Sequence, residues 1–256
     1  MSSNRCFRLI PIVLVSLVLA AGVAGAVTIS DQDAPSSALV GSQVSSTFEF
    51  SNLYQNPSYE SWTMQGQTEL ENVTWTVELL NQAGSVQGQQ SYDGAEFQQP
   101  ISLENDVATV NVQITGTVPP VQNFSYSPAP SFIFASFELA RQGGSSAPIQ
   151  EFETQHYTQE SQDARTAIDE AQTAIDEAGG NQQAQTTLNN AISAYEAENF
   201  GNAIDLANQA QQRATSAQQQ SQLIQYAIFA VIGLVILIAI VGGVYWYRKQ
   251  QRGGTL

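Results

Sequence analysis

Apolar and polar residues alternate with a period of two along much of the segment between Val40 and Thr158. Successive side chains of a β-strand point to opposite faces, so this alternation is typical of strands with one buried face. The alternation is clearest in four runs, which are Ser45–Phe50, Val73–Leu79, Val110–Val118 and Ile133–Leu139. Segments rich in Asn, Asp, Gly and Pro separate the runs. The pattern predicts about six to eight short antiparallel strands.

Strands of this number favour a two-layer sandwich, and the predicted architecture resembles the immunoglobulin-like type. The chain lacks the Cys…Trp…Cys pattern of immunoglobulin domains, so the resemblance concerns architecture and implies no shared function. A small β-barrel is the alternative arrangement. We therefore expect an antiparallel β-sandwich over residues 40–158 and a linker over residues 27–39.

From Gln159 onward the apolar spacing becomes that of an α-helix, and alanine replaces the β-branched residues. The hexamer Thr166–Ala171 is repeated at Thr173–Ala178, and Gly179-Gly180 then provides a helix end. Apolar residues at helical spacing form three stripes in this region: Ala164, Ile168, Ala171, Ile175 and Ala178; Ala184, Leu188, Ala191 and Tyr195; and Ala203, Ala207, Ala210, Ala214 and Ala217. The spacing predicts a stalk of three helices over residues 159–222, the third of them capped by Asn202.

Residues 194–210 resemble the helical hairpin of a tetratricopeptide repeat. The matching positions are Tyr195, the turn at Asn199-Phe200, Ala203-Ile204 and Ala210. The resemblance covers one hairpin of about 30 residues, whereas a peptide-binding groove needs at least about three repeats. It therefore implies a helical hairpin within the stalk and assigns no peptide-binding residues.

The N-terminal segment has the composition of a secretory signal peptide. The apolar run Leu9–Val18 follows Arg5 and Arg8 and precedes Ala24-Gly25-Ala26, which fits a cleavage site. We therefore expect a signal peptide over residues 1–26. An uncleaved signal anchor is the alternative.

A second apolar run, Tyr226–Tyr247, holds 22 residues without a charge, enough for a helix to cross a hydrocarbon core about 30 Å thick. Aromatic and basic residues flank it as expected membrane-interface anchors: Tyr226, Tyr245, Trp246, Tyr247, Arg248, Lys249 and Arg252. Because basic flanks stay in the cytoplasm, we expect a cytoplasmic tail over residues 248–256. The chain is thus predicted to be a type I single-pass protein of the cell membrane. It would contact lipid through residues 223–247 and expose residues 27–225 outside the cell.

Acidic residues dominate this exterior. Residues 27–225 hold all 23 acidic groups and only Arg141, Arg165 and Arg213 as basic groups, a net charge of −20. Such a surface disfavours nucleic acid and repels itself, although molar salt shortens the Debye length to about 3 Å and screens the repulsion. The lysine-poor composition, rich in Asp, Glu, Gln, Ser and Thr, resembles surface proteins of halophilic archaea. An acidic surface protein from a moderate environment is the alternative.

The chain offers few groups for catalysis. His156 is the only histidine, and the single cysteine, Cys6, lies in the predicted signal peptide. A lone histidine makes no catalytic triad, and we expect His156 to line the junction between sandwich and stalk. The loop Glu104–Asp106 lacks the ligand series of a calcium loop and is interpreted as a solvated turn. We therefore expect no enzymatic activity, no cofactor and no metal.

Two sequence patterns allow modification or ligand contact. Asn72-Val-Thr74 and Asn123-Phe-Ser125 make Asn72 and Asn123 possible N-glycosylation sites. Six aromatic residues near predicted loops suggest a sugar-binding surface, although packing within the loops is the favoured interpretation; they are Tyr54, Tyr59, Trp62, Tyr92, Phe124 and Tyr126.

These features predict a non-enzymatic cell-surface protein that displays a binding domain to a protein partner on the surface or in the membrane. The alternative is an accessory subunit of a membrane transport, secretion or envelope-assembly complex. An extracellular hydrolase is a third hypothesis, which the lack of a catalytic motif disfavours. No nucleic-acid partner is expected, and the sequence does not identify the ligand.

The polar segment 216–222 contains no helix breaker, so we expect the third stalk helix to continue into the membrane segment. Proline inside a helix removes a hydrogen bond and costs about 3 kcal/mol. We predict that Gln219→Pro uncouples stalk and anchor, which spin-label distances across position 219 would report as a broadened distribution. An equally broad distribution in the unsubstituted protein would contradict this prediction.

Overall fold

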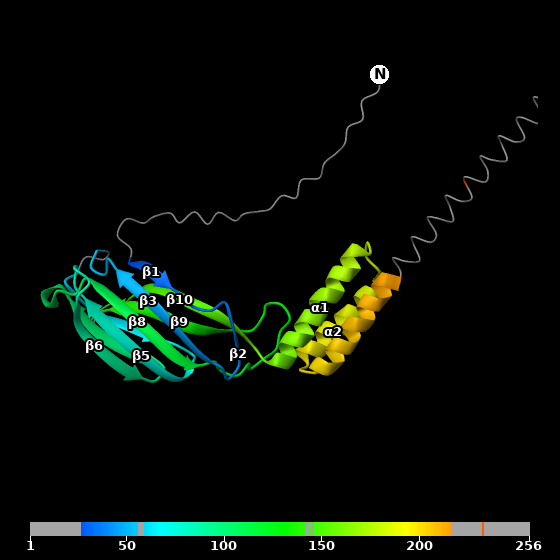
Figure 1. Ribbon diagram of the computed structural model, residues 1–256, viewed down its shortest axis with the longest axis horizontal. Helices are drawn as coiled ribbons and strands as arrows, with labels where there is room; N and C mark the ends of the chain where they lie inside the picture. The colour runs from blue at the N-terminus through cyan, green and yellow to red at the C-terminus, as the bar shows by residue number, and fades with distance from the viewer. Residues whose placement is uncertain (1–26, 56–58, 142–143, 145, 217–231, 233–256) are drawn as a thin grey trace, which may run out of the picture.

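The computed structural model describes residues 27–55, 59–141, 144, 146–216 and 232. Within these residues the chain forms a ten-stranded β-sandwich followed by a helical region. The two parts lie end to end along the long axis of the molecule (Figure 1). The predicted order, a sandwich and then helices, is confirmed.

The first sheet consists of five antiparallel strands in the spatial order β1-β3-β8-β5-β6. Their bounds are β1 Thr28–Gln32, β3 Gln43–Ser51, β8 Thr109–Thr117, β5 Glu71–Leu80 and β6 Val86–Asp93. In β5, Val73 and Trp75 are buried, whereas Thr74 between them is exposed. The alternation in the sequence therefore marks the face of this sheet that is turned toward the core.

The second sheet has the order β2-β10-β9-β4-β7. Its strands are β2 Ser37–Leu39, β10 Ser146–Tyr157, β9 Ser131–Ala140, β4 Ser61–Gln67 and β7 Glu96–Ser102. The short strand β2 runs parallel to β10, and the other neighbours are antiparallel. A single residue, Thr158, separates the end of β10 from the first helix, so the second sheet leads directly into the helical region.

Residues 27–39 form two edge strands instead of the expected linker. Strand β1 pairs with β3 in the first sheet, and β2 pairs with β10 in the second. Their sequences are short and mostly polar and carry little alternation of their own. They become strands because the edges of β3 and β10 offer backbone groups that need hydrogen-bond partners.

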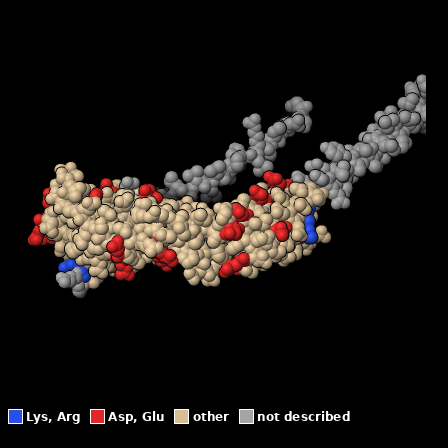
Figure 2. All heavy atoms as spheres, turned by 60° about the horizontal axis from the view of Figure 1, so that its bottom comes forward, with Lys and Arg blue, Asp and Glu red and all other residues tan. Residues whose placement is uncertain are grey.

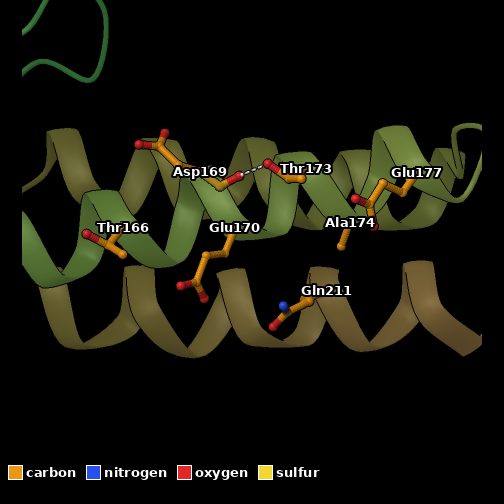
Figure 3. Close-up of a pocket in the computed structure, with 7 residues that line it drawn as sticks. All are labelled: Thr166, Asp169, Glu170, Thr173, Ala174, Glu177 and Gln211. Carbon is orange, nitrogen blue, oxygen red and sulfur yellow. Dashed lines mark hydrogen bonds between the residues drawn. The ribbon is translucent and has the colours of Figure 1, made fainter.

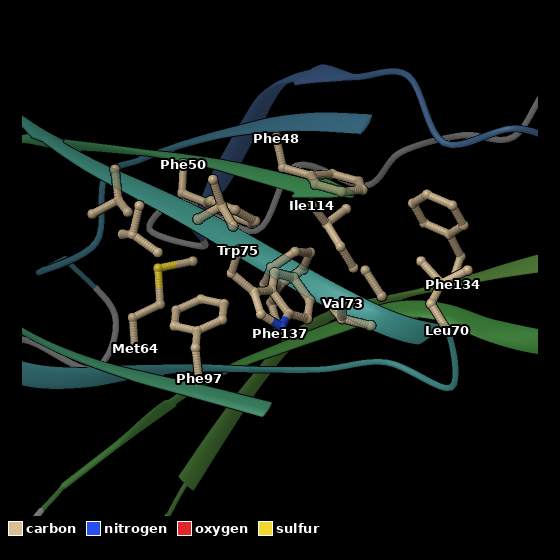
Figure 4. Packing of buried hydrophobic residues seen from close by; sticks show 14 of the residues in the cluster. Phe48, Phe50, Met64, Leu70, Val73, Trp75, Phe97, Ile114, Phe134 and Phe137 are labelled. Carbon is tan, nitrogen blue, oxygen red and sulfur yellow. The ribbon is translucent and has the colours of Figure 1, made fainter. Parts of the chain in front are cut away.

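Aromatic rings from both sheets fill the space between them (Figure 4). Phe48, Phe50 and Trp75 come from the first sheet and Phe137 from the second, and each is at most 1% exposed. The Phe137 ring centroid lies 5.0 Å from that of Phe48 and 4.7 Å from that of Phe50. Nε1 of Trp75 donates to the carbonyl oxygen of Gly94 at 3.0 Å, so the polar atom of this buried ring is paired.

The helical region contains α1 (Gln159–Glu177), α2 (Gln182–Glu196) and a further helical segment, residues 200–216. Thr158 caps α1 in a capping box with Ser161, and the left-handed φ of +80° at Gly179 helps to end it. Among the described members of the three predicted apolar stripes, Ala178 is partly buried and all others are buried. The predicted inner faces of the helices are therefore confirmed.

The third helical segment begins earlier than the sequence predicts. Asn199, and not Asn202, occupies the capping position: its Oδ1 accepts from the Asn202 amide at 3.4 Å, and its carbonyl oxygen accepts from the Ala203 amide at 2.9 Å. A cap at Asn202 would leave Phe200 and Gly201 outside the helix. Packing of the Phe200 ring on Tyr195, with centroids 5.4 Å apart, instead draws Phe200 into the helix.

The predicted ends of the chain lie outside the described residues. These comprise the signal peptide 1–26, the tail 248–256 and, except for Ile232, the membrane segment 223–247 with its interface anchors. Among the helices of the described part, none combines the length and apolar character needed to cross a bilayer.

We predict that Phe137→Ala destabilises the protein by about 3–5 kcal/mol, because it removes a ring that contacts both sheets and leaves a cavity. Urea unfolding of the full chain, followed by near-ultraviolet circular dichroism, would measure the change. Leu103→Ala is the control, since Leu103 is 51% exposed and its truncation should change stability by less than about 0.5 kcal/mol. Equal losses in both variants would contradict the assigned core.

Candidate functional site

Within the described part of the chain, three surface pockets of similar size lie at different places along the molecule. Their volumes are about 420, 380 and 420 Å³, within the range of small-molecule sites. The first lies on the helices, the second at the junction with the sandwich, and the third beside β4, β7 and the end of β9. The side chains that line them differ in charge and polarity.

The pocket on the helices is an open acidic groove between α1 and residues 200–216 (Figure 3). Glu170 and Gln211 extend into the space between the two helices, whereas Asp169 points away from it (Figure 3). Thr173 donates to the backbone oxygen of Asp169 at 2.9 Å, an ordinary bond within a helix. In the described structure no three His, Cys, Asp or Glu side chains are grouped to hold a metal ion. The groove is therefore best interpreted as a solvated helix surface.

The junction is built by the loop of residues 118–130, which joins β8 to β9 and extends to the helices. The ring of Phe124 lies 4.9 Å from Phe200 and 6.3 Å from Tyr195, measured between centroids. Arg165 of α1 donates to the backbone oxygens of Ser125, at 3.2 Å, and of Tyr126. These contacts attach a sandwich loop to all three helical segments through apolar and charged groups.

Tyr126 adds a polar contact to this junction. Its hydroxyl donates to Oδ1 of Asp169, and the Arg165 guanidinium carbon lies 4.8 Å from its ring centroid. Burial, reinforced by the hydrogen bond to Asp169 and the charge of that carboxylate, raises the pKa of Tyr126 to about 12. The phenol therefore stays protonated, and able to donate, at any ordinary pH.

His156 lies beneath the same loop, in the wall of the junction pocket. The side chain is 7% exposed, and its ring centroid lies 5.1 Å from that of Phe132. Nδ1 is 3.0 Å from the carbonyl oxygen of Pro119. Because a carbonyl only accepts hydrogen bonds, this contact requires the proton on Nδ1. The histidine thus lines the junction, as the sequence predicts, and fixes the start of the loop.

The third pocket lies at the end of the sandwich farthest from the helices. Strand β9 begins at Ser131, next to the junction loop, so its last residue, Ala140, lies about 30 Å away along the strand. Arg141 follows Ala140 and lines the pocket together with Ser61, Thr63 and Ser102. Arg141 is the single basic residue of the sandwich. No carboxylate among the described residues forms a salt bridge with it.

Aromatic rings hold Arg141 in place. Its guanidinium carbon lies 3.9 Å from the ring centroid of Tyr59, and Tyr59 in turn packs edge-on against Trp62 at 5.1 Å. Trp62 is 4% exposed, and its buried Nε1 has no hydrogen-bond partner among the described residues. Acidic side chains are spread over the face shown in Figure 2, where basic side chains gather only near the two ends. The pocket beside Arg141 is therefore a candidate contact site for a polar or anionic group.

The six aromatic residues singled out in the sequence do not form one surface. Tyr59 and Trp62 lie at the far end, and Phe124 and Tyr126 lie at the junction. Tyr54 and Tyr92 pack on the sandwich core, and burial raises the pKa of Tyr54 to about 12. Sequence reasoning missed Arg141 as a site residue, although its isolation in an acidic domain was a readable signal.

The remaining predicted positions lie apart from these pockets or at their rims. Asn72 is exposed in β5 at a left-handed φ of 51°, and Asn123 is exposed in the junction loop. Glycosylation of either residue stays a prediction. The loop Glu104–Asp106 begins in a short 3-10 turn, whose Glu104 amide donates to the Ser102 hydroxyl at 3.1 Å.

Comparisons with known proteins identify no family. No protein-family model and no curated protein matches the chain. Spo0M, a sporulation control protein from Bacillus subtilis, is 13% identical in sequence, with a TM-score of 0.30. The similarity covers 57% of this chain and 55% of the Spo0M chain. The collagen-binding domain of a Staphylococcus aureus adhesin is 9% identical in sequence, with a TM-score of 0.25. The similarity covers 45% of this chain and 88% of that domain. The C-terminal domain of wzt is 12% identical in sequence, with a TM-score of 0.23. The similarity covers 52% of this chain and 75% of that domain.

These similarities are too distant to inform function. The chain spans about half of the length of Spo0M, 55% of it. At TM-scores this low, what the other proteins bind or control says nothing about this chain.

We predict that Arg165→Gln loosens the joint between sandwich and helices. The substitution removes the charged donor that holds two carbonyl groups of the loop, and losing such bonds costs about 1–3 kcal/mol. Spin labels at Gln98 and Asn189 should report a wider distance distribution than in the unsubstituted protein.

Arg213→Gln provides the matched control for this experiment. It removes the same charge, but Arg213 donates to Thr187 within the helical region and has no role at the joint. Identical distance distributions in the two variants would refute a role for Arg165 in fixing the joint.

Proposed function

We propose that this chain is a non-enzymatic, type I single-pass surface protein that displays an immunoglobulin-like sandwich as a binding domain on a helical spacer. Residues 1–26 would direct export, and residues 223–247 would anchor the chain in the membrane. The net charge of −20 over residues 27–225 suits an exterior in concentrated salt, as in the surface proteins of halophilic archaea that the composition resembles.

The observation that carries the proposal is the course of the chain through the helical region. The first helix, α1, starts beside the sandwich, α2 returns toward it, and residues 200–216 run away from it again (Figure 1). Phe200 contacts the sandwich loop, and a helix from there to residue 216 extends about 24 Å. Because the number of antiparallel helices is odd, the third one ends on the side opposite to the sandwich. The proposed anchor follows that end in the sequence.

The joint between the two parts suits a spacer. Strand β10 continues into α1 through the cap at Thr158, and the junction loop makes a second connection through Phe124, Tyr126 and Arg165. Two separate connections resist bending better than one. The pocket beside Arg141 would then be held far from the membrane, where a partner on the cell surface can reach it.

Protease treatment of intact cells tests this proposal. Residues 27–225 should be degraded from outside, whereas an epitope tag placed after Leu256 should remain protected until the cells are permeabilised. A cytoplasmic protein that stays intact in unpermeabilised cells is the control. If residues 27–225 are protected in intact cells and are degraded only after permeabilisation, the proposed topology is wrong.

A further inference from the structure

The sandwich has four edge strands, and three of them offer no long uninterrupted edge to another strand. Strand β1 has an irregular register between Ile29 and Asp31, and β2 is only three residues long. Strand β7 contains Pro100, which has no N–H group to donate. Bulges, short length and proline are the usual means by which proteins keep sheet edges from associating.

Strand β6 is the other edge of the first sheet and contains no proline. Its register with β5 shifts once, near its start, where Gln87 is an extra residue between the pairs Leu80–Val86 and Leu79–Gly88. The strand is eight residues long and pairs only with β5 among the described strands. Its register with β5 is unbroken from Gly88 to Asp93. Gln87, Gln89 and Gln90 are exposed, and Val86 is 57% exposed. An edge of this kind offers a row of backbone donors and acceptors to another strand.

The chemistry of β6 is unusual for so acidic a chain. Residues 86–92 carry no charge, although the chain has 23 acidic groups. On the neighbouring strand the Glu78 carboxylate accepts a hydrogen bond from Nε2 of Gln89 at 3.0 Å. Because each glutamine amide both donates and accepts, glutamines can bond to their own kind, which carboxylates cannot do when ionised.

We propose that β6 pairs with the β6 strand of a second copy of this chain. A closed dimer made through one edge is isologous, so its two strands run antiparallel. Pairing at β6 brings two uncharged edges together, whereas contact through most other surfaces would oppose carboxylates to carboxylates. Molar salt screens the remaining repulsion between the copies and favours the pair.

Antiparallel pairing also orients the two molecules. The strands run roughly lengthwise in the molecule (Figure 1), so the helical regions of the two copies point away from each other. If each helical region leads to the proposed anchor, the two anchors lie at opposite ends of the dimer. Such a dimer would join two molecules that are held in facing membranes. That arrangement depends on the proposed function, whereas the pairing of the edges does not. A single pair of short strands buries a small interface, so the dimer should form reversibly.

Cysteine cross-linking of the full chain in detergent and molar salt tests the pairing. In a Cys6→Ser background, single cysteines at Gln87, Gln89, Gln90 and Ser91 would be oxidised and the dimer yield measured. An antiparallel pair brings only residues beside its two-fold axis within disulfide range of their own copies, so the yield should peak at one position. The matched control is Gln98→Cys, an exposed glutamine on the blocked edge strand β7, which should give little dimer.

Sedimentation of the same protein gives a second readout. The unsubstituted chain should show a monomer–dimer equilibrium. Gln89→Lys adds a strongly hydrated ammonium group to the uncharged edge, which pairing would partly remove from water, and should reduce the association constant at least about tenfold. Gln98→Lys should leave it unchanged, and circular dichroism would verify that both variants are folded.

Any one of three results would overturn the proposal. In the first, the chain stays monomeric at all tested concentrations in molar salt. In the second, the cysteine at position 98 gives as much cross-linked dimer as those in β6. In the third, every tested position of β6 gives the same dimer yield. All three can be obtained without a membrane, so they leave the proposed surface topology to its own test.

Discussion

Burial of aromatic rings between two sheets is the interaction on which the rest of this structure depends. The only cysteine, Cys6, precedes the described residues, so no disulfide joins the sheets. Phe48, Phe50 and Trp75 meet Phe137 in the centre, and large aromatic side chains each bury about 150–250 Å². This packing fixes where the strands end, and therefore where the junction loop and the pocket beside Arg141 lie.

The helical region depends on the sandwich in turn. Its inner faces consist mostly of alanine, which permits close packing but buries little area for each residue. Phe124 and Tyr126 extend this small core with rings supplied by the sandwich, and Arg165 satisfies two carbonyl groups of the loop that carries them. The junction is therefore part of what stabilises the helices as well as what orients them.

Surface charge imposes a second constraint. A net charge far from zero favours solubility, yet it also limits which surfaces can meet another copy or an anionic partner. Two places on the sandwich depart from the acidic background: the far end, where Arg141 lies on Tyr59, and strand β6, whose residues 86–92 are uncharged. The helices, by contrast, present a largely acidic groove.

Periodicity in the sequence determined the two-part architecture, the buried faces of β5 and β9 and the stripes of the helices, because alternation and helical spacing record which side chains avoid water. It did not reveal β1 and β2, whose short polar sequences become strands only against the edges of β3 and β10. Nor did it bring Tyr59, Trp62 and Arg141 together, or join Tyr126 to Asp169, residues that are distant in the chain. Those contacts follow from how the strands cross and where the loops fold back, and local patterns carry no record of such long-range geometry.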